Sequence, residues 1–173
     1  MANWSNVRLL VAGRRFDVLC FSRLTRARPS AVFESDMLAG EAQELFSERA
    51  ERLDTNRLSK VYKFQVRNGD GIQHFRRVSR QHPALCFVLT YGDPNFDDYG
   101  SYFIFEGRVR KHNISNRRKA AVMASHGVTG KDDVDDVDDD WRFWEASREL
   151  MDLAEAHWQP SVLRAIAPIR PQH

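Results

Sequence analysis

The stretch LSKVYKFQVRNGDGIQHFRRVSRQHPALCFVLTY, residues 58–91, decides the fold class of this chain. Within its first ten residues, one side of the predicted strand has Tyr62, Phe64 and Val66, and the other has Val61, Lys63, Gln65 and Arg67. This period of two indicates a strand with one buried face. A Gly-rich turn follows at 68–71, and residues 72–81 carry apolar side chains at helical spacing. The helix must end before Pro83, because proline disfavours helical backbone in the residue that precedes it. The continuous apolar run 84–91 then indicates a central strand, so the stretch predicts a strand–helix–strand unit.

The flanking segments add further elements. Trp4–Ala12 is apolar at alternate positions and predicts a strand, whereas Phe16–Leu24 has helical spacing, although a strand also fits it. Apolar residues at three-to-four spacing predict an inserted helix near 36–54. Residues 102–109 read as extended, and we expect them to form an antiparallel hairpin with 84–91. Residues 1–112 are therefore predicted to form an α+β core, a ferredoxin-like antiparallel sheet with helices on one face.

The remaining residues, 113–173, predict a helical C-terminal extension. Ser115 is placed to cap a short helix over 117–125, and an acidic linker, 132–140, leads to a long helix over about 139–158. Pro160 is expected to end that helix and leave a loose tail. The pattern leaves open whether the long helix, rich in tryptophan, packs on its own sheet or on a second copy of the chain, which would make a homodimer.

Several short stretches carry a family resemblance. They are Asn3-Trp4, Arg8-Leu9, Phe64-Gln65-Val66, His82-Pro83-Ala84-Leu85, Phe87-Val88-Leu89-Thr90-Tyr91 and the loop leading to Gly107. In these stretches the chain resembles a family of uncharacterised ferredoxin-like proteins encoded by phages, plasmids and conjugative elements. That family begins Met-Pro-Asn-Trp-Cys, where this chain has Ala2 and Ser5, and its Trp-Gly-rich strand is absent here. The resemblance implies a fold and a mobile-element setting, and it implies no reaction.

The composition of the chain limits the kinds of protein that it can be. Of 173 residues, 42% are hydrophobic and 29% are charged, as in ordinary globular proteins. No apolar run approaches the roughly 18 residues of a membrane span, and the N-terminus does not look like an export signal. We therefore expect a cytoplasmic protein without a membrane partner. Cys20 and Cys86 each lie in an apolar run, which predicts two buried free thiols.

Chemical motifs are missing from the sequence. The six histidines form no HxH or HExxH pattern, and no G-x-S-x-G elbow is present. The aspartates of 132–140 do not match a calcium loop in any register, because the glycine and the final bidentate acid are not both supplied. We therefore predict a non-enzymatic protein with no catalytic residues, no metal and no cofactor; an uncharacterised enzyme is kept as an alternative.

Charge is segregated along the chain although the net charge is only +2. The acidic linker and the two tryptophans after it are predicted to bind a protein partner, either by imitating nucleic-acid phosphates or by docking on a basic surface. A host or defence protein is the target that the mobile-element setting suggests. A solvated linker that stabilises the following helix is the plainer interpretation. The residues of this predicted partner site are Asp132, Asp133, Asp135, Asp136, Asp138, Asp139, Asp140, Trp141 and Trp144.

Basic residues offer an alternative function. Arginines on the predicted helix 72–81 and the bases that follow residue 107 could contact phosphates, and exposed aromatic side chains of a ferredoxin-like sheet could stack bases. This hypothesis makes the chain an RNA- or DNA-binding protein. Its residues are Arg76, Arg77, Arg80, Arg110, Lys111, Arg117, Arg118 and Lys119.

Overall fold

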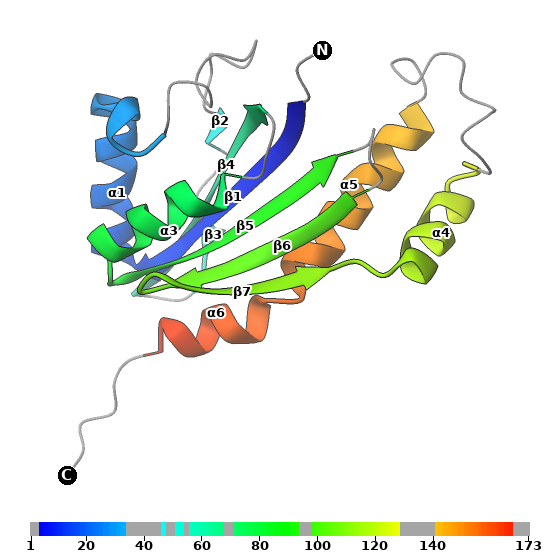
Figure 1. Cartoon of the computed structure of the whole chain (residues 1–173). Coiled ribbons are helices and arrows are strands. Elements are labelled where there is room, and N and C mark those ends of the chain that lie inside the picture. The colour runs from blue at the N-terminus through cyan, green and yellow to red at the C-terminus, as the bar shows by residue number, and fades with distance from the viewer. Residues whose placement is uncertain are drawn as a thin grey trace.

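The computed structural model describes residues 4–33, 46–47, 51–53, 56–67, 71–93, 98–128 and 141–167. Its centre is an antiparallel sheet whose long strands follow the order β4-β1-β5-β6-β7 (Figure 1). The bounds of these strands are Trp4–Arg14 (β1), Arg57–Arg67 (β4), Leu85–Asp93 (β5), Asp98–Phe105 (β6) and Arg108–Asn113 (β7). The chain is therefore α+β with an antiparallel sheet, as its sequence predicts.

The strand–helix–strand unit predicted from residues 58–91 is present. β1 pairs antiparallel with both β4 and β5, so β4 and β5 run parallel to each other with β1 between them. Helix α3 (Ile72–Gln81) connects β4 to β5 and ends before Pro83. A β-α-β unit split by an intervening strand is a feature of ferredoxin-like sandwiches.

One sheet face is covered by α3 and by α1 (Arg15–Ala27), and we call it the α1–α3 face. Alternation along the strands directs one set of apolar side chains to this face, including Val7, Leu9 and Val11 of β1. Edge-to-face contacts link its aromatic rings, a geometry that ring quadrupoles favour. The large buried rings are Phe21, Phe33, Tyr62, Phe64, Phe75 and Phe87.

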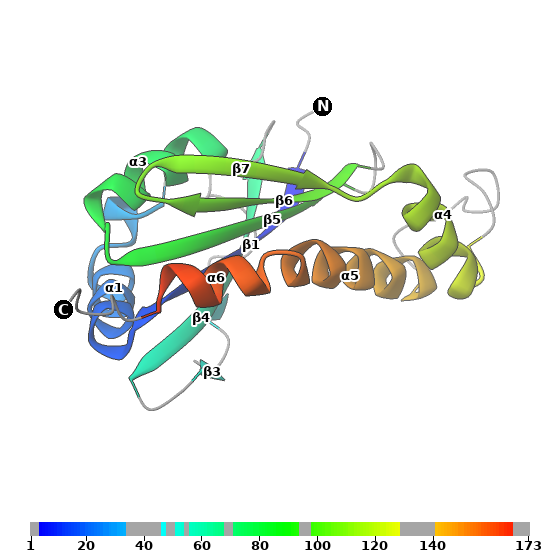
Figure 2. The ribbon, with the colours of Figure 1, turned by 90° about the horizontal axis from the view of Figure 1, so that it is seen from below.

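The opposite face is covered by α5 (Trp141–Ala156) and α6 (Gln159–Ala165), which follow one another along the sheet (Figure 2). We call it the α5–α6 face. Trp158, between the two helices, packs with Val162 against Val88 and Phe103 of the sheet. Its indole Nε1 donates a hydrogen bond to Ser101 Oγ, 2.9 Å away. The question left open by the sequence is thus answered for Trp158, which packs on its own sheet.

The inserted helix predicted near 36–54 is wrong over the part that the structure describes. Phe46–Ser47 (β2) and Glu51–Arg52 (β3) are short strands that pair antiparallel with β4. Helical spacing in the sequence is outweighed here by the unpaired backbone groups at the outer edge of β4, which these strands partly satisfy. Residues 34–45 lie outside the described residues.

Two boundaries after residue 100 also differ from expectation. The run 102–109 is split between β6 and β7 by a tight turn, in which Glu106 and Gly107 have φ of 50° and 74°. Positive φ at both central residues is the backbone of a type I′ hairpin turn. Pro160 does not end the helical region but lies in the first turn of α6, where its missing N–H costs no hydrogen bond.

The two cysteines have different environments. Cys86 is buried on the α5–α6 face, and burial raises the pKa of its thiol to about 12. Cys20 is exposed on α1, so the prediction of a second buried thiol is wrong. The apolar run 16–24 belongs to an amphipathic helix, and Cys20 falls on its outer side.

The helices of the described segments are short or amphipathic, and none of them combines the length and the apolar character needed to cross a bilayer.

Candidate functional site

The acidic linker has no described structure, because residues 129–140 lie outside the described residues. This applies to Asp132, Asp133, Asp135, Asp136, Asp138, Asp139 and Asp140. The two tryptophans of the same predicted site are described: Trp141 and Trp144 lie in the first turn of α5, 65% and 40% exposed. Large aromatic side chains with this exposure are available for contact with a ligand or a partner.

The basic residues predicted from sequence lie on three elements, α3, β7 and α4 (Asn116–Ser125). β7 is the last strand in the sheet order, and α4 continues from its far end (Figure 1). At the near end, Arg76 Nε donates to the Gly107 carbonyl at 3.0 Å, and the Gly107 N–H donates to Ser79 Oγ at 2.8 Å. These bonds fasten α3 to the β6–β7 turn, so segments distant in sequence share one border of the sheet.

We call this border the basic edge. Between residues 99 and 128, Glu106 is the single acidic residue. Arg77 lies on the exposed surface of α3 beside this edge. The residues that define the basic edge are Arg76, Arg80, Arg108, Arg110, Lys111, Arg117, Arg118 and Lys119.

Aromatic rings orient two cations of this edge. The Arg110 guanidinium lies 5.1 Å from the ring centres of both Phe103 and Trp158, on the α5–α6 face. Lys111 Nζ lies 5.4 Å from the Tyr102 ring, on the other face. Successive side chains of a strand point to opposite faces, so β7 displays positive charge on both sides of the edge.

The rings themselves are not available for base stacking. Tyr102 and Phe103 are buried, because helices cover both faces of the sheet. The expectation that exposed aromatic side chains of the sheet could stack bases is therefore wrong for these strands. The basic edge offers cations, and hence contacts to phosphate.

The predicted cap of α4 is confirmed. Ser115 Oγ accepts a hydrogen bond from the Arg118 backbone N–H at 3.3 Å. A serine in this position satisfies one of the free N–H groups at a helix start and thereby defines where the helix begins. Arg117 and Arg118 consequently lie in the exposed first turn of α4, next to the end of β7.

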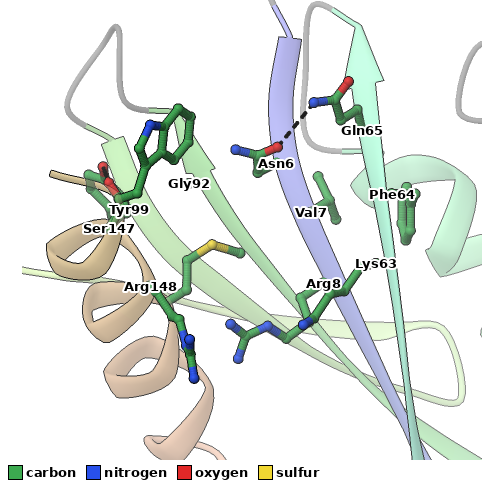
Figure 3. Close-up of a pocket in the computed structure, with 12 residues that line it drawn as sticks. Asn6, Val7, Arg8, Lys63, Phe64, Gln65, Gly92, Tyr99, Ser147 and Arg148 are labelled. Atoms are coloured by element: carbon green, nitrogen blue, oxygen red, sulfur yellow. Dashed lines mark hydrogen bonds between the residues drawn. The ribbon is translucent and has the colours of Figure 1, made fainter. Parts of the chain in front are cut away.

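A second candidate site is a pocket of about 310 Å³ between α5 and the sheet (Figure 3). The α5 helix forms one wall, and β1, β4 and the end of β5 form the floor. The sequence alone does not reveal this pocket, since its residues come from four strands and a helix and become neighbours only through strand pairing and helix docking. The lining residues are Asn6, Val7, Arg8, Lys63, Phe64, Gln65, Gly92, Tyr99, Trp144, Ser147, Arg148 and Met151.

Three cations and no acid line this pocket. Register places Arg8 of β1 directly opposite Lys63 of β4, and Figure 3 shows Arg148 of α5 directed toward Arg8. The Arg8 side chain is 14% exposed, and its Nη1 forms ion pairs with Asp152 at 2.5 Å and with Glu155 at 3.7 Å, both outside the lining. Arg148 is exposed and forms no ion pair with another residue that the structure describes.

Polar and apolar groups complete the walls. Gln65 Nε2 donates to Asn6 Oδ1 at 3.3 Å on the floor (Figure 3), and the Tyr99 hydroxyl is hydrogen-bonded to Ser147 Oγ at 2.7 Å. A side chain at Gly92 would approach the Tyr99 ring to 3.0 Å, so the glycine permits the close approach of this wall. The pocket thus combines fixed hydrogen-bonding groups with positive charge.

Neither site has the composition of a metal centre. Across the segments described, no three His, Cys, Asp or Glu side chains gather where they could hold an ion. Comparisons of the chain with protein-family models, with curated proteins and with solved structures found no match.

Proposed function

We propose that this chain is a non-enzymatic nucleic-acid-binding protein that contacts the phosphate backbone through its basic edge. One observation supports the proposal above all: α3, β7 and α4 bring eight basic side chains to one border of the sheet, and residues 99–128 contain one acidic residue, Glu106. Rows of Lys and Arg neutralise phosphates and release condensed counterions, which supplies affinity without base recognition.

The proposed ligand is a duplex rather than a single strand. Sequence-tolerant binding of single strands depends on aromatic platforms, and the rings next to the basic edge are buried. A duplex presents its phosphates outside and needs no stacking contact. A cytoplasmic protein of a phage or plasmid, as the family resemblance implies, would meet such duplexes, and we propose that setting for it.

The experiment is a fluorescence-anisotropy titration of a duplex of about 20 base pairs at several salt concentrations. Each phosphate contact contributes about one unit to the slope of log affinity against log salt. We expect Arg117→Ala with Arg118→Ala to weaken binding about tenfold and to lower the slope by about two. These side chains are exposed in α4, so the variant should fold.

The matched control removes two exposed arginines from α1, as Arg15→Ala with Arg23→Ala. It changes the net charge equally but leaves the basic edge intact, so its affinity should stay within about twofold of the wild type. If both double variants lost the same affinity for the duplex, net charge alone would explain the loss and the basic edge would have no special role. No complex at low salt would exclude nucleic-acid binding.

A protein partner is the second candidate, since Trp141 is exposed immediately after the acidic linker. An aromatic side chain beside seven carboxylates is suited to a basic surface on a host or defence protein, whose action the chain would block. Pull-down from host lysate should lose its captured protein when the aspartates of 132–140 become Asn and Trp141 becomes Ala. Unchanged recovery of the captured protein would show that this segment does not bind it.

A further inference from the structure

We propose that the pocket between α5 and the sheet binds a nucleotide, with its phosphate among Arg8, Lys63 and Arg148 and its base against Trp144. The proposal does not depend on the basic edge, because the pocket floor includes β1 and β4 whereas β7 is the opposite end of the strand order.

The charge of the pocket supports an anionic ligand. Arg8 and Arg148 approach from opposite walls, and Lys63 is the cross-strand neighbour of Arg8. Arg148 forms no ion pair with a described residue, so an anion in the pocket would give it an opposite charge, and Arg8 and Lys63 would add N–H donors. Asp152 and Glu155 both pair with Nη1 of Arg8, at 2.5 and 3.7 Å, and neither lines the pocket, so the other N–H groups of the guanidinium remain for a ligand.

The ligand carries more than a phosphate. A volume of about 310 Å³ is at the lower end of the range for small-molecule sites, roughly 300–1,000 Å³, and exceeds what one inorganic phosphate fills. Met151, Tyr99 and Trp144 supply an apolar and aromatic wall. A phosphate attached to a flat ring matches both parts of the pocket.

Helix α5 sets the distance between the aromatic part of the pocket and its cationic part. Trp144 and Arg148 are four residues apart on α5, so they lie on one face with about 6 Å between their Cβ atoms. A ribose separates base from phosphate over a comparable length. An indole ring also stacks on any base, whereas an acidic peptide would leave Trp144 without a flat partner.

The test is calorimetric titration of the full chain with 5′-mononucleotides, with the matching nucleosides, with ribose 5-phosphate and with inorganic phosphate. We expect the mononucleotides to bind about tenfold or more tightly than any ligand that lacks the base or the phosphate. Arg148→Ala should weaken nucleotide binding about tenfold by removing the phosphate contact, and Trp144→Ala should do so by removing the stacking partner.

Arg23→Ala is the control, since it removes an exposed arginine from α1 and should leave affinity unchanged. A short oligonucleotide with a 5′-phosphate distinguishes a free nucleotide from the end of a nucleic acid: stronger binding of the oligonucleotide in the Arg117→Ala, Arg118→Ala background would identify the end as the source. The proposal would be overturned if the wild type bound no nucleotide, or if the Arg148→Ala and Trp144→Ala variants bound it as tightly as the wild type does. Either result would leave the proposal for the basic edge unaffected.

Discussion

The two faces of the sheet are built on different principles. The α1–α3 face is a continuous apolar core, in which aromatic rings from α1, α3 and the strands contact one another. The α5–α6 face has apolar clusters at its two ends, and between them a polar row crosses all five long strands. Strand register places the row in the order Lys63, Arg8, Thr90, Ser101 and His112.

Helix α5 and His157, the residue that follows it, supply partners for this row. Asp152 pairs with Arg8, the Ala154 carbonyl accepts from Ser101 Oγ at 2.6 Å, and the His157 ring stacks on His112 at 3.7 Å. The first face is therefore held by apolar burial throughout, whereas the second adds specific polar pairs to its apolar clusters. The difference teaches that α5 is positioned by polar contacts as well as by its buried apolar side chains.

Phe75→Ala should have the largest effect. Phe75 is 0% exposed and its ring lies 5.6 Å from that of Phe64 and 5.9 Å from that of Phe33. Removing it leaves a cavity in the apolar face, so urea unfolding should show a loss of about 4 kcal/mol. The exposed Phe16 is the matched control, and its change to Ala should cost less than about 0.5 kcal/mol. Similar losses in both variants would contradict an apolar core centred on α3.

Ser101→Ala tests the polar row. This buried hydroxyl accepts from the Trp158 indole and donates to the Ala154 carbonyl, so its removal leaves two groups without their partner. We expect a loss of about 2 kcal/mol in the free energy of unfolding, against almost none for the exposed Ser30→Ala. A neutral Ser101→Ala would mean that α5 is held by apolar contact alone.

Thr90→Val should act in the opposite direction. Thr90 is adjacent to Ser101 in the row and fully buried, and its Oγ1 has no hydrogen-bond partner in the described structure. Valine has nearly the same shape and removes the cost of burying an unpaired hydroxyl, so stability should rise by about 1 kcal/mol. Destabilisation by Thr90→Val would indicate that this hydroxyl is bonded in solution.

The smallest expected effect is a dependence on pH that both faces share. Burial lowers the pKa of His82, beside Phe21 on the first face, and of His112 on the second, where His157 adds to the effect. The native state thus binds protons less readily than the unfolded chain, whose histidines titrate near 6.5. The stability that these neutral histidines contribute is fully present above that pH, and it declines as the pH falls below it.

The measurement is urea unfolding at pH 7.5 and pH 5.5. We expect the variant with His82→Gln and His112→Gln to lose less stability between these values than the wild type does. An identical loss in both proteins would show that other groups cause the acid sensitivity.

Local patterns predicted much of the first face. The alternation of Tyr62, Phe64 and Val66 gave the buried side of β4 directly, and the stripe of Phe75 and Val78 gave that of α3. Both signals depend on periods of two and of 3.6 residues, which the backbone geometry imposes on any neighbour. The cap at Ser115 was found for the same reason, because it is a contact within four residues.

Long-range contacts were not predictable in this way. Phe46–Ser47 and Glu51–Arg52 became strands because β4 lay beside them, although their local spacing favoured a helix. The pocket residues Arg8, Lys63 and Arg148 share no spacing, since strand register and helix docking alone bring them together.

The sequence by itself determined the strand–helix–strand unit, its apolar side and the clustering of charge along the chain, because these depend on residues a few positions apart. The tertiary structure alone decided that α5 and α6 cover the second face, that three separate basic segments share one edge, and that three cations surround a pocket. Those features depend on which strands pair and in which register, and pairing is governed by the total burial and hydrogen bonding of the whole sheet.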